Sequence, residues 1–203
     1  MALLSKRPAS DFDDDAVVAS FYNSVADEDG FMRQYMQLGQ LAVIIDSTLY
    51  VHGGVYGVFD KSKGLQSCVG LVPSGDDLLN QSFVENRDDW VLQLNQWMQS
   101  QVAAIIASPA YDAGRVTRRG QALFLYGSYS PTPSVIMARM LDDASMPLEM
   151  PESAASLLKK WGVCRVVCGH TPHGNAPTVF TRHGVEVRKH WLQLSFSDFL
   201  FLR

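Results

Sequence analysis

The sequence predicts an α/β fold, and three observations lead to that prediction. Strand-like apolar runs alternate with helical patterns through the C-terminal half of the 203 residues, as expected when strands and helices form separate layers. Two stretches, 86–107 and 151–161, carry helix start and stop signals. Hydrophobic residues make up 47% of the chain and charged residues 19%, a composition typical of a globular core.

We expect residues 1–38 to form a helical N-terminal segment. Acidic residues 11–15 would cap a helix over 16–26, because carboxylates accept hydrogen bonds from the free N–H groups at a helix start. The apolar residues of this helix fall on one stripe: Val17, Val18, Phe21 and Val25. A second short helix over 31–38 would end at Gly39.

The periodicity then changes to that of strands. Leu41–Ile45 and Leu49–Val51 predict two strands joined by a tight polar turn, and the second strand runs directly into His52-Gly53-Gly54. Residues 57–80 are rich in Gly, Ser, Lys and Asp, which predicts a loop. A long helix should follow over Asn86–Ala107, with Asn86 as its N-cap.

The remainder predicts further α/β layering. Residues 109–150 look irregular, with one strand expected at Ser134–Met140, and a helix should follow over Pro151–Trp161. Three short strands are then expected: Val163–Cys168, Thr178–Arg182 and Val185–His190.

Composition excludes several classes of function. The net charge is −4, from 17 basic and 21 acidic residues, so a generic nucleic-acid-binding surface is not expected. The apolar runs are too short to span a bilayer, and the N-terminus has no extended apolar stretch of a secretory signal. Three cysteines (Cys68, Cys164 and Cys168) cannot form a disulfide framework. We therefore expect a cytoplasmic protein with neither a membrane nor a nucleic-acid partner.

Two histidines occupy matching positions in the sequence. His52 and His170 each stand where a predicted strand enters a turn that contains glycine. The strand would fix the backbone, and glycine lets an ion or phosphate approach the main chain. Imidazole is also the commonest neutral metal ligand. The alternative for each residue, a hydrogen-bonded structural histidine, remains open at this point.

A zinc site is less consistent with the spacing. Cys164 and Cys168 in one strand would lie about 13 Å apart at ~3.3 Å per residue, too far for one zinc ion with Zn–S bonds near ~2.3 Å. A site built from Cys168, His170 and His173 would need a fourth ligand that the sequence does not reveal.

Three segments together resemble a known family. They are Leu49-Tyr-Val-His52-Gly-Gly54, Thr132-Pro-Ser-Val-Ile-Met-Ala-Arg139-Met-Leu and Val166-Val-Cys-Gly-His170-Thr-Pro172. In order and spacing they resemble the calcineurin-like metallophosphoesterases, most of all the bacterial-like, Shewanella-like branch of the PPP-type phosphatases. The resemblance implies that residues 39–187 form the C-terminal half of that domain, part of a two-sheet α/β sandwich with flanking helices. The family's N-terminal strands would be missing, and residues 188–203 would be a divergent apolar tail.

The resemblance also implies a chemistry. The family hydrolyses phosphoesters with two divalent metal ions, of the manganese, iron or zinc type. His52 and His170 match two ligands of one metal, and Arg139 matches a residue that binds substrate phosphate. The implied substrate is a phosphorylated protein or a small phosphoester. If the two histidines share a metal, their ligand nitrogens must lie within about 4 Å of one another.

Other parts of the family pattern are missing. No Gly-Asp-x-His, Gly-Asp-x-x-x-Asp-Arg-Gly or Gly-Asn-His-Glu motif precedes His52, and these motifs supply the other ligands and the general acid in the family. We therefore expect a truncated product or incomplete gene model that is weak or inactive alone. The alternative is a non-catalytic interaction module that pairs with another chain, or with itself, through an exposed sheet edge.

Overall fold

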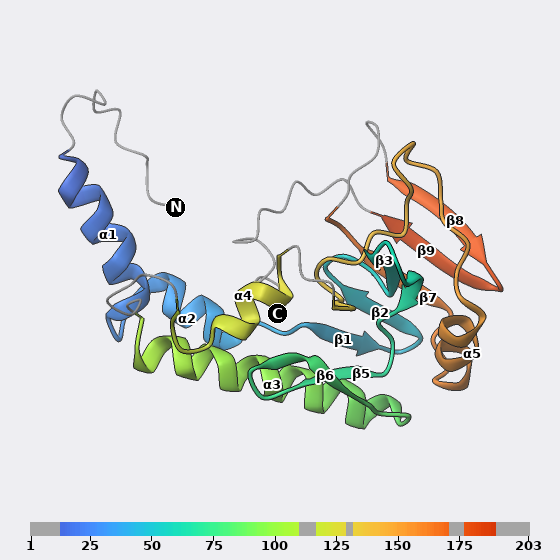
Figure 1. Cartoon of the computed structure of the whole chain (residues 1–203), viewed down its shortest axis with the longest axis horizontal. Helices are drawn as coiled ribbons and strands as arrows, with labels where there is room; N and C mark the ends of the chain where they lie inside the picture. Colours follow the sequence, from blue (N-terminus) through green and yellow to red (C-terminus); the bar gives the residue numbers. More distant parts are fainter. Residues whose placement is uncertain (1–12, 110–116, 129–131, 171–176, 190–203) are drawn as a thin grey trace.

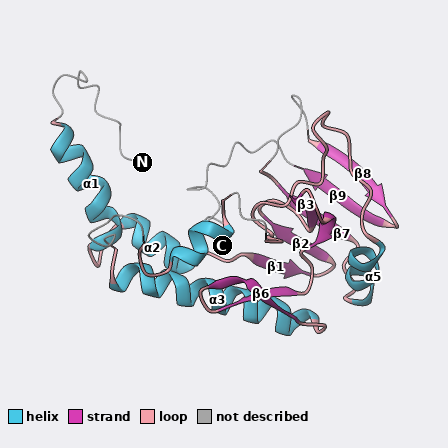
Figure 2. Cartoon of the chain, in the orientation of Figure 1, coloured by secondary structure: helices cyan, strands magenta, loops and turns pink. Residues whose placement is uncertain are grey.

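The structure, a computed structural model, has a mixed α/β fold built around a mixed five-stranded sheet (Figure 1). It describes residues 13–109, 117–128, 132–170 and 177–189. The order of strands in the main sheet is β1-β2-β7-β9-β8. Outside this sheet, the described residues form two separate hairpins, β3-β4 and β5-β6. Figure 2 shows the strands gathered toward one end of the molecule, with helix α1 extending from the other end.

The main sheet has a parallel centre. Strands β1 (Ala42–Ile45) and β2 (Thr48–Val51) form the expected antiparallel hairpin. Strand β2 pairs in parallel with β7 (Arg165–Cys168), and β7 pairs in parallel with β9 (Val185–Lys189). Strand β8 (Thr178–Arg182) closes the far edge in antiparallel pairing with β9. Because β2, β7 and β9 run the same way, their carboxyl ends meet at one edge of the sheet.

The prediction of a loop at 57–80 is wrong, because that region forms two hairpins. Their strands are β3 (Tyr56–Asp60), β4 (Gly64–Ser67), β5 (Leu71–Ser74) and β6 (Asp77–Phe83). The loop-like residues are the turns between short strands. The Asp60 carboxylate accepts hydrogen bonds from the amide and hydroxyl of Ser62 in the first turn, and Gly75 has a φ of 58° in the second, where glycine is favoured.

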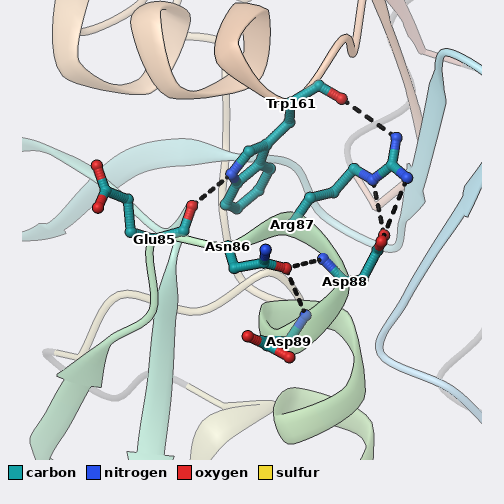
Figure 3. A network of polar contacts seen from close by, with 6 residues as sticks. All are labelled: Glu85, Asn86, Arg87, Asp88, Asp89 and Trp161. Atoms are coloured by element: carbon teal, nitrogen blue, oxygen red, sulfur yellow. Dashed lines mark hydrogen bonds and ion pairs between the residues drawn. The ribbon is translucent and has the colours of Figure 1, made fainter.

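Helix α3 (Arg87–Ala107) closely matches the helix expected from the sequence. The side chain of Asn86 caps it by accepting hydrogen bonds from the amides of Asp88 and Asp89 at 2.9 and 3.1 Å (Figure 3). Its buried face carries Trp90, Leu94, Trp97, Met98 and Ile105, which recur at near-helical spacing.

The start of α3 is tied to the end of helix α5 (Glu152–Lys160). The indole N–H of Trp161 donates to the Glu85 carbonyl at 2.7 Å, and Arg87 donates to the Trp161 carbonyl at 3.3 Å (Figure 3). The Trp161 ring also stacks on Trp90 with centroids 5.1 Å apart. These contacts fix α5, and hence the start of β7, against the long helix.

The N-terminal helices form where the sequence predicts them, but α1 packs differently. Helix α1 (Asp14–Ala26) begins at the N-cap Asp13, and α2 (Phe31–Leu38) ends at Gly39. The apolar stripe of α1 is largely in solvent, since Val18 is 67% and Phe21 72% exposed. Only Val25 of that stripe packs against the core.

The strand expected at Ser134–Met140 is a turn instead. Ser134 stabilises it: its hydroxyl accepts from the amide of Ile136 at 3.1 Å, and its carbonyl accepts from the amide of Ala138 at 2.9 Å. The same hydroxyl donates to the carbonyl of Tyr126, at the end of a short helix, α4 (Gln121–Tyr126), that the sequence did not predict. Side-chain hydrogen bonding thus competes successfully with strand formation.

None of the helices among the described residues has the length and apolar character needed to cross a membrane.

Candidate functional site

The candidate site lies at the carboxyl ends of the three parallel strands. His52 directly follows β2, His170 lies two residues beyond the end of β7, and Lys189 is the last residue of β9. Ligand sites in open α/β sheets commonly occupy this edge, because loops diverge from the strand ends there.

The two histidines meet as their shared strand context predicts. The Nδ1 atom of His170 lies 3.3 Å from Nε2 of His52, and the ring centroids are 5.2 Å apart at 61°. The expected proximity of the rings is therefore confirmed. Two nitrogens bound to one tetrahedral ion at ~2.0–2.1 Å would lie about 3.3–3.4 Å apart. The observed spacing suits a pair of ligands on one metal, and it is also that of a hydrogen bond between the two rings.

Backbone contacts hold this pair in place. The amide of Gly169 donates to the carbonyl of His52 at 2.7 Å, which joins the two turns directly. His170 has a φ of 63°, in the left-handed region that non-glycine residues seldom adopt. Such strain is retained where surrounding structure imposes it, and it concentrates at functional sites.

Gly53 connects the histidine pair to the turn at 134–140. Its amide donates to the Val135 carbonyl at 2.7 Å. A Cβ at this position would lie 2.2 Å from the Ile136 carbonyl oxygen and 2.8 Å from that of Ala138. Both obstacles are backbone, so only glycine lets the turn approach His52 this closely.

Burial keeps both imidazoles neutral near pH 7. His52 is only 6% exposed. Its pKa is lowered to about 4, first by burial and then by the neighbouring His170. The pKa of His170 is also lowered, first by burial and then by the positive charges of Arg139 and Lys189. Neutral imidazoles offer lone pairs, which metal ligation requires.

One ring atom lacks a protein partner among the described residues. The Nε2 atom of His170 is buried, and no residue that the structure describes hydrogen-bonds to it. This nitrogen is not the one that faces His52, because Nδ1 of the same ring makes that contact.

Arg139 lies close enough to His170 for its charge to act on that imidazole, but neither histidine lines the cavity that Arg139 borders. Its positive charge acts on His170, and its backbone packs against Gly57, where a Cβ would lie 2.9 Å from the Arg139 nitrogen. The exposed side chain lines a cavity of about 430 Å³ together with Phe59, Lys61 and Asp142. No carboxylate in the described part of the chain forms an ion pair with Arg139.

Sequence reasoning missed Lys189. The strand expected at Val185–His190 contains it, and β9 confirms that strand to Lys189, but the lysine was placed in the divergent tail of residues 188–203 and not among the candidate site residues. The lysine is only 2% exposed and continues the buried face formed by Val185 and Val187. The available signal was the alternation Val-Glu-Val-Arg-Lys, which puts position 189 on the apolar face of the strand.

The metal ligands that the structure supplies are incomplete. Among the described residues no group of three or more His, Cys, Asp or Glu side chains could hold a metal ion. The pair His52–His170 fits two positions around one ion, whereas the described residues do not fit a two-metal centre with a bridging carboxylate. The zinc alternative is not supported either: Cys164 is exposed while Cys168 is buried, and His173 lies outside the described residues.

Comparisons with protein-family models, with curated proteins and with solved structures found no match for this chain.

Proposed function

We propose that this chain carries the metal- and phosphate-binding C-terminal half of a metal-dependent phosphoesterase site. The observation that carries the proposal is the 3.3 Å approach of His52 Nε2 and His170 Nδ1 at adjacent parallel strand ends. A structural histidine pair would not require the left-handed backbone that His170 adopts, with a φ of 63°.

Each residue has a distinct task in this proposal. The two imidazoles bind one divalent cation through their facing nitrogens, and the guanidinium of Arg139 binds two oxygens of a phosphate group. A bound cation at this position would polarise the phosphoryl group and acidify a water molecule. No catalytic step follows from the described residues alone, because they supply neither further metal ligands nor a general acid.

The proposal includes the fold and the substrate class. The five-stranded sheet with its helices would correspond to part of a metallophosphoesterase sandwich, and the substrate would be a phosphorylated protein or a small phosphoester. We expect the isolated chain to turn over weakly or not at all.

Metal titration tests the site directly. Isothermal titration with Mn²⁺ and with Co²⁺ should show one binding event in the chain, and His52→Ala should abolish it. His183→Ala is the matched control, because that histidine lies near Glu149, outside the candidate site, and should leave binding unchanged. Equal binding by the chain and by His52→Ala would refute the metal site.

Turnover tests the expected incompleteness. An aryl phosphate assay with Mn²⁺ should give a rate far below ~1 s⁻¹, a usual enzyme rate. A rate near that value, lost in His52→Ala, would mean that the missing ligands come from residues beyond those described or from a second chain.

A non-catalytic interaction module is the second candidate. Within the described residues, the edge strands β1 and β8 each pair on one side only, and they expose Ile45 and Val179. An edge of this kind can accept a strand from another chain. Sedimentation velocity should then show self-association that weakens in Val179→Lys, and a monomer at all concentrations would argue against it.

A further inference from the structure

Ser134 is a buried polar residue whose hydroxyl makes hydrogen bonds in both directions. The residue is only 1% exposed. Its hydroxyl donates to the backbone carbonyl of Tyr126 at 2.7 Å, and it accepts from the amides of Ile136 and Met137 at 3.1 and 3.4 Å. The Ser134 carbonyl accepts from the amide of Ala138 at 2.9 Å. One serine therefore holds the whole turn from residue 134 to residue 138.

Tyr126, the last residue of helix α4, holds the same turn through a second contact. Its phenol oxygen accepts from the Val135 amide at 3.2 Å, while its backbone carbonyl receives the Ser134 hydroxyl. Tyr126 is 1% exposed and Val135 is fully buried. Hydrogen bonds in such an interior are strengthened by the low dielectric and favour one arrangement of their groups.

The Ser134 hydroxyl sets the direction of the Val135 carbonyl. The Ile136 N–H and the Val135 C=O belong to one planar trans peptide unit, in which the two groups point in opposite directions. Because the N–H is fixed on the Ser134 oxygen, the carbonyl points away from that serine. There it accepts from the amides of Gly53 and Gly54 at 2.7 and 3.3 Å.

The turn thereby connects two parts of the candidate site. The two amides that it holds directly follow His52, whose own carbonyl accepts from the Gly169 amide at 2.7 Å. At its other end, Arg139 directly follows Ala138, the last residue of the turn. A change in this turn should therefore alter the placement of the backbone at both His52 and Arg139.

We propose that Ser134 is a positioning residue of this site: its hydroxyl orients the Val135 carbonyl, which fixes the backbone that holds His52 against His170. The metal-binding consequence rests on the proposed function, whereas the placement of the two imidazoles does not. Groups that orient a metal ligand from one step away typically change metal affinity by 10–100-fold when they are removed. Ser134 therefore acts on the metal through the backbone next to one ligand.

The first measurement needs no metal. In EDTA, the full chain with histidine as the only protonated residue type should show a nuclear Overhauser effect between the rings of His52 and His170, which lie with centroids 5.2 Å apart. Ser134→Ala should weaken or abolish this effect, because the Val135 carbonyl is no longer held in place. A loss of stability alone would not change the effect while the variant remains folded.

The second measurement is Co²⁺ binding. Isothermal titration should show an affinity at least about tenfold weaker in Ser134→Ala than in the unaltered chain, and the visible spectrum of the bound Co²⁺ should change with the ligand geometry. Tyr126→Phe is a second variant that serves if Ser134→Ala does not fold. It keeps the buried ring, removes only the acceptor for the Val135 amide, and should weaken Co²⁺ binding in the same direction by a smaller factor.

Asn86→Ala is the matched control. Like the Ser134 hydroxyl, the Asn86 side chain accepts from the amides two and three residues ahead, but it does so at the start of α3. This variant should lose stability while keeping the effect between the rings and the Co²⁺ affinity.

Three results bear on the inference in different ways. A ring contact or a Co²⁺ affinity that is unchanged in folded Ser134→Ala would overturn it, and so would losses of equal size in Ser134→Ala and Asn86→Ala. Absence of Co²⁺ binding from the unaltered chain would refute the proposed metal site instead. The contact between the rings would then decide the positioning role by itself.

Discussion

Replacing Gly53 by alanine should damage the candidate site through the backbone alone. The added Cβ would lie 2.2 Å from the Ile136 oxygen and 2.7 Å from the Ile136 carbonyl carbon. Neither atom belongs to a flexible side chain, so the turn at 134–140 must move away from His52.

The cost can be worked from two contributions. Overpacking in a tight interior costs roughly 1–3 kcal/mol. Movement of the turn also weakens the hydrogen bond from the Gly53 amide to the Val135 carbonyl, at 2.7 Å, which contributes about 0.5–1.5 kcal/mol. We therefore expect Gly53→Ala to lower the free energy of unfolding by about 2–4 kcal/mol.

Urea unfolding followed by tryptophan fluorescence measures this change. Gly169→Ala is the matched control at the same site, because the nearest atom to its Cβ would be the His52 oxygen at an ordinary 3.7 Å. That variant should range from no change to a gain of about 1 kcal/mol. Equal losses in the two variants, or a loss below about 0.5 kcal/mol in Gly53→Ala, would refute the close approach of the 134–140 turn.

Two further predictions concern a helix cap and a buried imidazole. Asn86→Ala removes the acceptor for two amides of α3 and should lower the free energy of unfolding by about 1 kcal/mol. The measurement is the Tm, which should fall by roughly 2–4 °C for a chain of this size. Asn86→Ser should retain most of the stability. The pKa of His52 falls from 6.5 to about 4 on folding. Between about pH 4 and pH 6.5, His52 therefore binds a proton in the unfolded chain but not in the folded chain. The free energy of unfolding in EDTA should therefore be greatest above pH 6.5 and decline toward pH 4 by up to about 3 kcal/mol; His52→Gln should lack this contribution, and equal pH slopes in the two proteins would contradict it.

Local patterns predicted the elements whose causes are local. The Asn86 cap and the apolar spacing of 86–107 define α3 within the sequence itself, and Gly39 ends α2. The matching settings of His52 and His170 also predicted their proximity, because parallel strands bring equivalent ends together.

The missed features have different physical causes. The turn at Ser134 replaces the expected strand because its hydroxyl and carbonyl find partners in Tyr126 and Ala138. Burial of Lys189 depends on its neighbours in the sheet, and lysine at a strand end is ordinarily exposed. The hairpins at 57–80 escaped detection because residues typical of turns, such as Gly, Ser and Asp, also occur within these short strands.

The separation of the two histidines along the chain has a consequence for folding. They stand 118 residues apart, and the described residues between β2 and β7 form two hairpins and three helices. Contacts of such long range form slowly, because the entropy of closing the intervening chain is lost before the contact compensates for it. During synthesis, β2 can pair with β7 only after Cys168 has left the ribosome. The histidine pair therefore forms only when β2 and β7 have paired across this separation.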